Sequence, residues 1–274
     1  MQTRTRNTSV LIGSVLIGLV VLAALLSFFW TPHDPEKVNA AARLLGPTGD
    51  YVFGTDKFGR DVASQIMVGA RTTLYVGVVA VGIAAVIGTP LGMFAGMSKR
   101  WLGEFVMRGN DLVLAFPALL LAIMFGAVYG ASTLTAMIAI GIATVPSFAR
   151  IARSGTLQVM STEYVLAARS GGRSRFAIAS RHVLPNISGL LIVQASVSFA
   201  IAVLAEAALS FLGFGTAPPT PSWGRMLQES QELLTVQPRL ALVPGIAIAV
   251  AVLGFNLLGD GLRDRFDPRL AVGS

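Results

Sequence analysis

Long apolar stretches are the feature of this sequence that most restricts its fold. A bilayer core of about 30 Å requires about 20 apolar residues in a helix. Residues 10–30 meet this requirement without a charge and end in Phe28, Phe29 and Trp30, aromatic residues of the kind that gather at the membrane–water boundary. Five further stretches follow, at about residues 74–97, 112–129, 131–148, 187–214 and 240–258. The sequence therefore predicts an all-α membrane protein with six transmembrane helices.

The composition favours the same fold class. Of the 274 residues, 54% are hydrophobic and only 13% are charged, whereas soluble domains carry about 25% charged residues. Because Arg4 and Arg6 precede the first stretch, a cleaved signal peptide is an alternative there. The stretch is long for a signal peptide and lacks an A-x-A-like cleavage site, so we favour an uncleaved helix. The chain has no cysteine, which excludes disulfides and thiolate chemistry and leaves the redox compartment open.

The distribution of positive charge predicts the orientation of the chain. If the N-terminus lies inside, the inner segments hold 14 Lys and Arg residues and the outer segments hold seven, five of them in the long segment 31–71. Cytoplasmic loops of membrane proteins carry such an excess. We therefore expect both termini to lie in the cytoplasm. Topology also explains the net charge of +7 better than nucleic-acid binding does.

The basic segment 149–185 carries the most functional information, with six Arg residues and one Glu. Residues 163–172 predict a short helix that is stopped by glycine. A second short helix is expected up to Arg181, before Leu184 and Pro185 open the next span. Ala167 and Ala168 have small side chains, so another protein can approach the first helix closely. The segment either docks a partner protein or merely sets the topology.

Other features have structural interpretations. Gly88, Gly92 and Gly96 are spaced by four and predict a smooth strip for helix packing. Pro90, Pro117 and Pro146 are expected inside transmembrane helices. Glu206 is an acid inside the fifth stretch, where ionisable groups are costly. We favour a structural or gate-lining role for Glu206 over direct contact with a substrate.

The segment 164–186 resembles the EAA loop of binding-protein-dependent ABC importer permeases. Two positions depart from the pattern of that family. Leu166 stands where Glu is usual, and His182 stands at an apolar position. Because leucine is uncharged, Leu166 cannot form a salt bridge from that position. The predicted helix does not depend on this salt bridge. The positions that fit at the expected spacing are Ala167, Ala168, Gly172, Leu184 and Pro185.

Four further stretches are similar to the C-type permease subunit of dipeptide, oligopeptide and nickel importers. They are residues 53–62 with 69–71, 205–215, 218–224, and 256–264 with 267–269. The resemblance extends from about residue 30 to the end of the chain. It implies a type I ABC importer permease fold. Residues 1–71 would hold the first helix and an extracytoplasmic loop, and residues 72–274 a five-helix core with the coupling loop.

The resemblance also implies an assembly in the bacterial inner membrane. A homologous B-type permease would form the other half of the pore, two cytosolic ATPase subunits would each receive one EAA loop, and an extracytoplasmic protein would deliver peptide. Nickel or another small solute is the alternative cargo. The implied coupling residues are Glu163, Leu166, Ala167, Ala168, Gly172, Leu184 and Pro185. Glu206 is a pathway or gate candidate, and the candidates for outer contacts are Asp56, Arg60, Asp61 and Trp223.

The sequence contains no motif for chemistry of its own. It lacks G-x-x-x-x-G-K-[ST] and H-E-x-x-H, so we expect no catalytic residue and no cofactor, with ATP and Mg²⁺ bound by partner subunits. His33 and His182 are far apart, so no metal site is expected. Asp260 between two glycines is similar to the motif of intramembrane aspartyl proteases, but a lone acid provides no carboxylate dyad. A stand-alone secondary transporter or channel is a further alternative, although the chain shows no clear internal repeat.

Overall fold

The computed structural model describes the backbone of residues 2–266 and the side chains of residues 8–264, and the 267–269 motif lies outside this range. Within the described residues the regular structure is helical, with no β-strand. The helices are α1 (Gln2–Leu26), α2 (Val62–Met97), α3 (Arg100–Leu114), α4 (Ala118–Tyr129), α5 (Thr133–Met160), α6 (Glu163–Ser170), α7 (Arg175–Ile178), α8 (Leu184–Phe211), α9 (Trp223–Ser230) and α10 (Arg239–Phe266).

The helices confirm the predicted membrane protein, with one span broken. Among the described residues, five helical segments are long and apolar enough to cross a membrane, and the bent pair of α3 and α4 adds a sixth when the pair is counted as one span. The five are residues Thr8–Leu26, Val62–Met97, Thr133–Met160, Arg175–Phe211 and Arg239–Asp264.

The prediction of one helix through Pro117 was wrong. Helix α3 ends at Leu114, Pro117 immediately precedes α4, and the two helices meet at 76°. Proline lacks an N–H and disfavours helical geometry in the residue before it, so the chain turns at this point. Helix α3 also occupies most of the charged segment 99–111, which lies between two of the apolar stretches. Pro90 and Pro146 do lie inside helices, as predicted.

Helix α5 is longer than its apolar stretch. It continues from the predicted end near Phe148 to Met160, so the basic connection to α8 is shorter than the segment 149–185. Charged residues end an apolar run but do not end a helix, because Arg is a good helix former. Arg150 and Arg153 therefore lie on the continuing helix rather than in a loop.

The glycine strip on α2 packs against α5. A Cβ atom at Gly88 would lie 2.6 Å from the carbonyl oxygen of Val145, and one at Gly92 would overlap the carbonyl oxygen of Ala149. Gly96 faces Thr156 one turn further along. The two helices approach closely only because these positions lack side chains, which confirms the predicted packing face.

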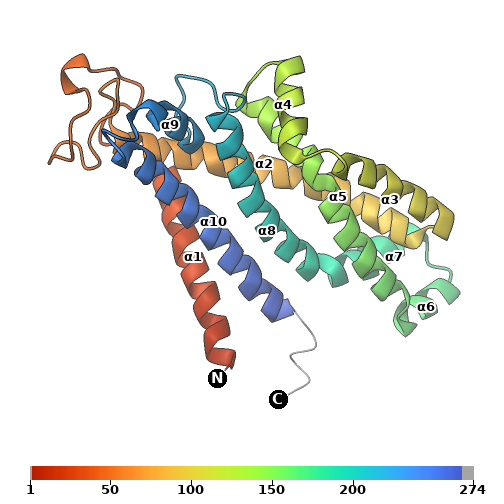
Figure 1. The fold of residues 1–274 in the computed structure, drawn as a ribbon. Coiled ribbons are helices and arrows are strands. Elements are labelled where there is room, and N and C mark those ends of the chain that lie inside the picture. The colour runs from red at the N-terminus through yellow and green to blue at the C-terminus, as the bar shows by residue number, and fades with distance from the viewer. Residues whose placement is uncertain (1, 267–274) are drawn as a thin grey trace.

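The two ends of the bundle differ in what they carry. Helices α1 and α10 lie side by side, and the first turn of α1 and the last turn of α10 lie on the same side as α6 and α7 (Figure 1). Residues 27–61 and α9 lie at the opposite end (Figure 1). An even number of spans produces this arrangement, because it returns the chain to the side where it began.

Candidate functional site

Helix α6 is fastened to the bundle by one buried side chain. Val165 is fully buried and belongs to an apolar cluster that includes side chains of α2, α5 and α8. The other buried members of the cluster are Met93, Ala152, Ile178, Val183 and Ile187. Because this cluster joins three long helices to α6, a displacement of α6 is transmitted to them directly.

Gly172 ends α6 as the sequence predicts. Its φ angle is +77°, in the left-handed region. The N–H of Arg173 donates to the carbonyl of Ala168 at 3.1 Å, and the N–H of Gly172 donates to that of Arg169 at 3.0 Å. These two bonds form a Schellman motif, which closes a helix and reverses the chain. The motif sets the direction in which α7 leaves α6.

We expect Gly172→Val to destabilise the α6–α7 turn by about 1–2 kcal/mol, because side chains strain the left-handed conformation. Purified protein should unfold at a lower temperature, and transport should fall with it. Gly171→Ala is the matched control. Gly171 has a φ of −77°, and a Cβ there makes an ordinary contact at 3.4 Å with the carbonyl oxygen of Ala167. Equal losses in the two variants would contradict the role assigned to Gly172.

The outward surface of α6 and α7 is apolar and has no cover within the described chain. Tyr164, Leu166 and Phe176 are 47%, 49% and 82% exposed. Ala167 lies exposed among them, and Ala168 is half-buried. We call Tyr164, Leu166, Ala167 and Phe176 the docking face. Exposed apolar patches of this kind mark sites of protein interaction.

The remaining predicted coupling residues flank the docking face. Glu163 is the exposed first residue of α6, and Leu184 and Pro185 are exposed where α8 begins. Sequence analysis missed Phe176, although an aromatic residue between Arg175 and a short apolar run could have indicated it. The structure thus brings all seven predicted coupling residues to one end of the bundle.

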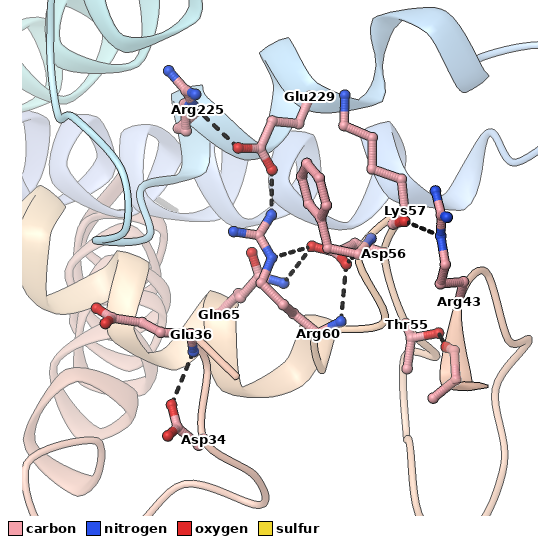
Figure 2. A network of polar contacts seen from close by, with 12 residues as sticks. Asp34, Glu36, Arg43, Thr55, Asp56, Lys57, Arg60, Gln65, Arg225 and Glu229 are labelled. Atoms are coloured by element: carbon pink, nitrogen blue, oxygen red, sulfur yellow. Dashed lines mark hydrogen bonds and ion pairs between the residues drawn. The ribbon is translucent and has the colours of Figure 1, made fainter. Parts of the chain in front are cut away.

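At the opposite end, Asp56 and Arg60 form a partly buried charge network with α9 (Figure 2). The Nε of Arg60 donates to Oδ2 of Asp56 at 2.6 Å, and Gln65 Nε2 donates to the same oxygen at 3.1 Å. The guanidinium of Arg60 also pairs with Glu229, which accepts a further bond from Arg225 at 3.1 Å. This network ties the segment 27–61 to α9.

Asp61 and Arg239 fasten the same segment to two other helices. Asp61 caps α2, accepting from the N–H of Ser64 at 2.9 Å and from its hydroxyl at 2.6 Å. Arg239, at the start of α10, donates to the carbonyls of Phe53 and Leu45 at 2.8 and 2.6 Å. Asp56 therefore pairs with Arg60, whereas Asp61 serves as a helix cap. Sequence analysis missed Glu229 and Arg239, because neither has a local signal.

Trp223 begins α9 and is an internal anchor. It is 2% exposed, and its Nε1 donates to the carbonyl of Ile66 at 3.0 Å. Its indole ring fills the space above Gly69, where a Cβ would lie 2.6 Å from the ring. The residue thus holds α9 against α2.

The histidines lie in separate surroundings. His33 stacks on Tyr51 with ring centroids 4.6 Å apart and lies 3.7 Å from Asp61. His182 lies beside Tyr164 of α6, at the other end of the bundle. In the part of the chain that the structure describes, no three His, Asp or Glu side chains form a group that could hold a metal ion.

Glu206 is buried at the outer end of α8 with 1% exposure. Its Oε1 accepts from the hydroxyl of Ser210 at 2.7 Å and from that of Thr216 at 3.4 Å. The Ser210 hydroxyl accepts from the N–H of Thr216 at 2.9 Å, and the Thr216 hydroxyl accepts from Thr133 on α5 at 3.2 Å. This chain of hydrogen bonds joins α8, the following loop and the start of α5.

We expect Glu206→Leu to destabilise the protein by about 1–3 kcal/mol, because it leaves buried hydroxyl groups without an acceptor. Glu206→Gln keeps an oxygen acceptor and should cost less than about 1 kcal/mol. Thermal unfolding of the purified variants measures both effects. If Glu206 acted by charge on a substrate, Gln would abolish uptake in a stably folded protein. We expect the Gln variant to retain uptake.

Comparisons with known proteins agree with this architecture. The profile of the family described as "Binding-protein-dependent transport system inner membrane component" matches residues 88–272. The dipeptide transport system permease protein DppC of Alkalihalophilus pseudofirmus is 41% identical over 97% of this chain and 87% of that protein. A putative peptide transport system permease protein of Brucella suis is 41% identical over 97% of this chain and 90% of that protein. The glutathione transport system permease protein GsiD of Pectobacterium atrosepticum is 39% identical over 94% of this chain and 87% of that protein.

A solved structure shows the same fold. A chain of the MetNI methionine ABC transporter, in an inward-facing conformation, superimposes with a TM-score of 0.63 at 17% identity, covering 74% of this chain and 96% of that chain. The similarity in fold therefore extends over most of the helical bundle. Together with the family profile and the close relatives, it shows that this chain belongs to the family of binding-protein-dependent transport system inner membrane components, the membrane-spanning permease subunits of ABC importers.

Proposed function

We propose that this chain is the C-type permease subunit of an ATP-driven peptide importer and forms half of the pathway across the bacterial cytoplasmic membrane. The observation that carries the proposal is the docking face on α6 and α7, at the end of the bundle that the positive charges assign to the cytoplasm. The names of the relatives, which include dipeptide, peptide and glutathione permeases, support peptide as the cargo.

The proposed partners occupy separate surfaces. A cytosolic ATPase receives the docking face, and a second ATPase receives the matching loop of a B-type permease. ATP and Mg²⁺ bind to the ATPases, since this chain has no phosphate-binding loop. An extracytoplasmic binding protein approaches the segment 27–61 and α9. Four of the predicted contact residues hold that surface in place from beneath, because their hydrogen bonds and ion pairs are to other residues of this chain. They are Asp56, Arg60, Asp61 and Trp223.

The proposed movement follows from how α6 is attached. Closure of the ATPases displaces α6, and Val165 passes the displacement to its apolar cluster on α2, α5 and α8. A well-packed cluster moves as a unit, so the response is a rigid-body rotation rather than a local deformation. The hydrogen-bonded chain at Glu206 holds the outer ends of α5 and α8 together during this rotation.

Uptake of labelled dipeptides, longer peptides and nickel, in cells with and without this gene, tests the proposal. We expect the deletion to remove energy-dependent peptide uptake and the restored gene to return it. If the deletion removed nickel uptake and left peptide uptake unchanged, the cargo would be nickel and not peptide. The proposed ATP-driven machinery would still hold. Uptake that persists without any ATPase partner would instead indicate a stand-alone transporter.

A further inference from the structure

A basic cavity lies between α6 and the bundle. Its volume is about 220 Å³, enough for several water molecules and hence for a phosphate group. Three arginines and three apolar side chains line it: Arg169, Arg173, Arg175, Met97, Met160 and Ile178.

The cavity faces away from the docking face. Arg169 follows the buried Val165 by four residues, so the two share one side of α6. Leu166 and Ala167 lie on the exposed side of the same helix. Met97 and Met160 are the last residues of α2 and α5, which places the floor of the cavity on the bundle itself. A ligand in the cavity therefore leaves the docking face free.

The charge of the cavity is not balanced within the described chain. No carboxylate lines it, and none of its three guanidinium groups has an ion pair among the described residues. Other arginines of this chain are paired, such as Arg60 with Asp56 and Arg150 with Asp111 at 2.6 Å each. Three like charges around one cavity repel one another, so an anion bound among them is favoured.

The cavity lies at the depth of lipid headgroups. A bilayer core takes about 20 helical residues, so α5, which starts at Thr133, reaches the inner boundary of the core near Ala152. Met160 lies about 12 Å further along the helix axis at 1.5 Å per residue, where the headgroups meet the cytoplasm. The apolar side chains at the floor of the cavity can contact the first carbons of the lipid acyl chains. The arginines can bind the phosphate group.

We propose that this cavity binds the phosphate headgroup of an anionic phospholipid in the cytoplasmic leaflet. Guanidinium groups form paired, charge-assisted hydrogen bonds with phosphate oxygens, and basic pockets at the cytoplasmic ends of transmembrane helices bind anionic headgroups. The bound lipid braces the turn between α6 and α7 against the ends of α2 and α5. The inference rests on the proposed function only for the cytoplasmic placement of α6.

Native mass spectrometry of the purified importer complex tests the proposal, with phosphatidylglycerol and phosphatidylcholine as probes. The double variant R173Q/R175Q removes two of the three charges. We expect it to retain phosphatidylglycerol on the order of tenfold less well, with no change for phosphatidylcholine. The matched control is R181Q, which removes an exposed arginine of the same segment that does not line the cavity. This control should retain phosphatidylglycerol as the unmodified complex does.

Four results would overturn the proposal. Unchanged retention in the double variant would show that the cavity holds no lipid, and equal loss in R181Q would show diffuse attraction to positive charge. Loss of the ATPase from the double variant with lipid retention intact would assign the arginines to an acidic protein partner. Inorganic phosphate is a further probe. If it binds and phosphatidylglycerol does not, the cavity binds free phosphate and not a lipid headgroup. Lipid retention is measured on the purified complex without transport. A negative result for peptide uptake is therefore distinguishable from a negative result for lipid binding.

Discussion

Replacing Ala167 by arginine is expected to weaken binding of the ATPase about a hundredfold and to abolish uptake, while the permease itself stays folded. Ala167 is exposed on α6 beside Leu166, so the new side chain can extend away from the bundle. Within a close-packed interface, the added volume and the buried charge together cost about 3 kcal/mol or more, and each 1.4 kcal/mol is a tenfold change in affinity. Arginine is also a good helix former, so α6 is preserved.

Co-purification of the ATPase with the tagged permease, together with uptake, measures the effect of Ala167→Arg. Ala167→Ser is the matched control, because serine adds a single oxygen at the same exposed position. We expect the serine variant to bind the ATPase and to transport normally. If the arginine variant bound the ATPase as well as the unmodified protein does, the docking face would not be the surface that binds the ATPase. A thermal unfolding temperature equal to that of the unmodified protein shows that the loss does not come from misfolding.

Features with a local cause could be predicted from the sequence. The spans follow from runs of apolar residues, and the end of α6 follows from Gly172, whose left-handed conformation favours glycine. The packing face of α2 follows from the spacing of Gly88, Gly92 and Gly96. In each case the responsible residues lie within a few helical turns of one another, so their pattern can be recognised in the amino-acid sequence.

Features that depend on residues far apart in the chain could not be predicted. Arg60 and Asp56 were identified as candidate contacts, but Glu229, which completes their network, lies 169 positions from Arg60. Nothing in the local sequence indicates that α9 folds over this segment. The break at Pro117 was missed for a different reason. Proline is tolerated inside some membrane helices, as Pro90 and Pro146 show here, and only tertiary packing decides which prolines end a helix.

Gly92→Val is expected to destabilise the bundle by about 3 kcal/mol or more, the largest loss of stability among the changes considered. A Cβ at position 92 would overlap the backbone of α5 at the carbonyl of Ala149. Backbone atoms cannot rotate away as a flexible side chain can, so α2 and α5 must separate, and the contacts of their neighbours weaken with them. Titration of the purified protein with a denaturing detergent should show unfolding at a clearly lower concentration than for the unmodified chain.

Gly82→Val makes the same chemical change on the same helix and is the control for this prediction. Gly82 is exposed, and no atom lies within 4 Å of a Cβ built there, so the valine side chain extends away from the protein. We expect its stability to stay within about 0.5 kcal/mol of the unmodified chain. If both variants lost stability equally, the cause would be the valine itself within α2. A loss confined to position 92 requires that α2 and α5 be in close backbone contact, the contact through which Val165 and its cluster would move both helices together.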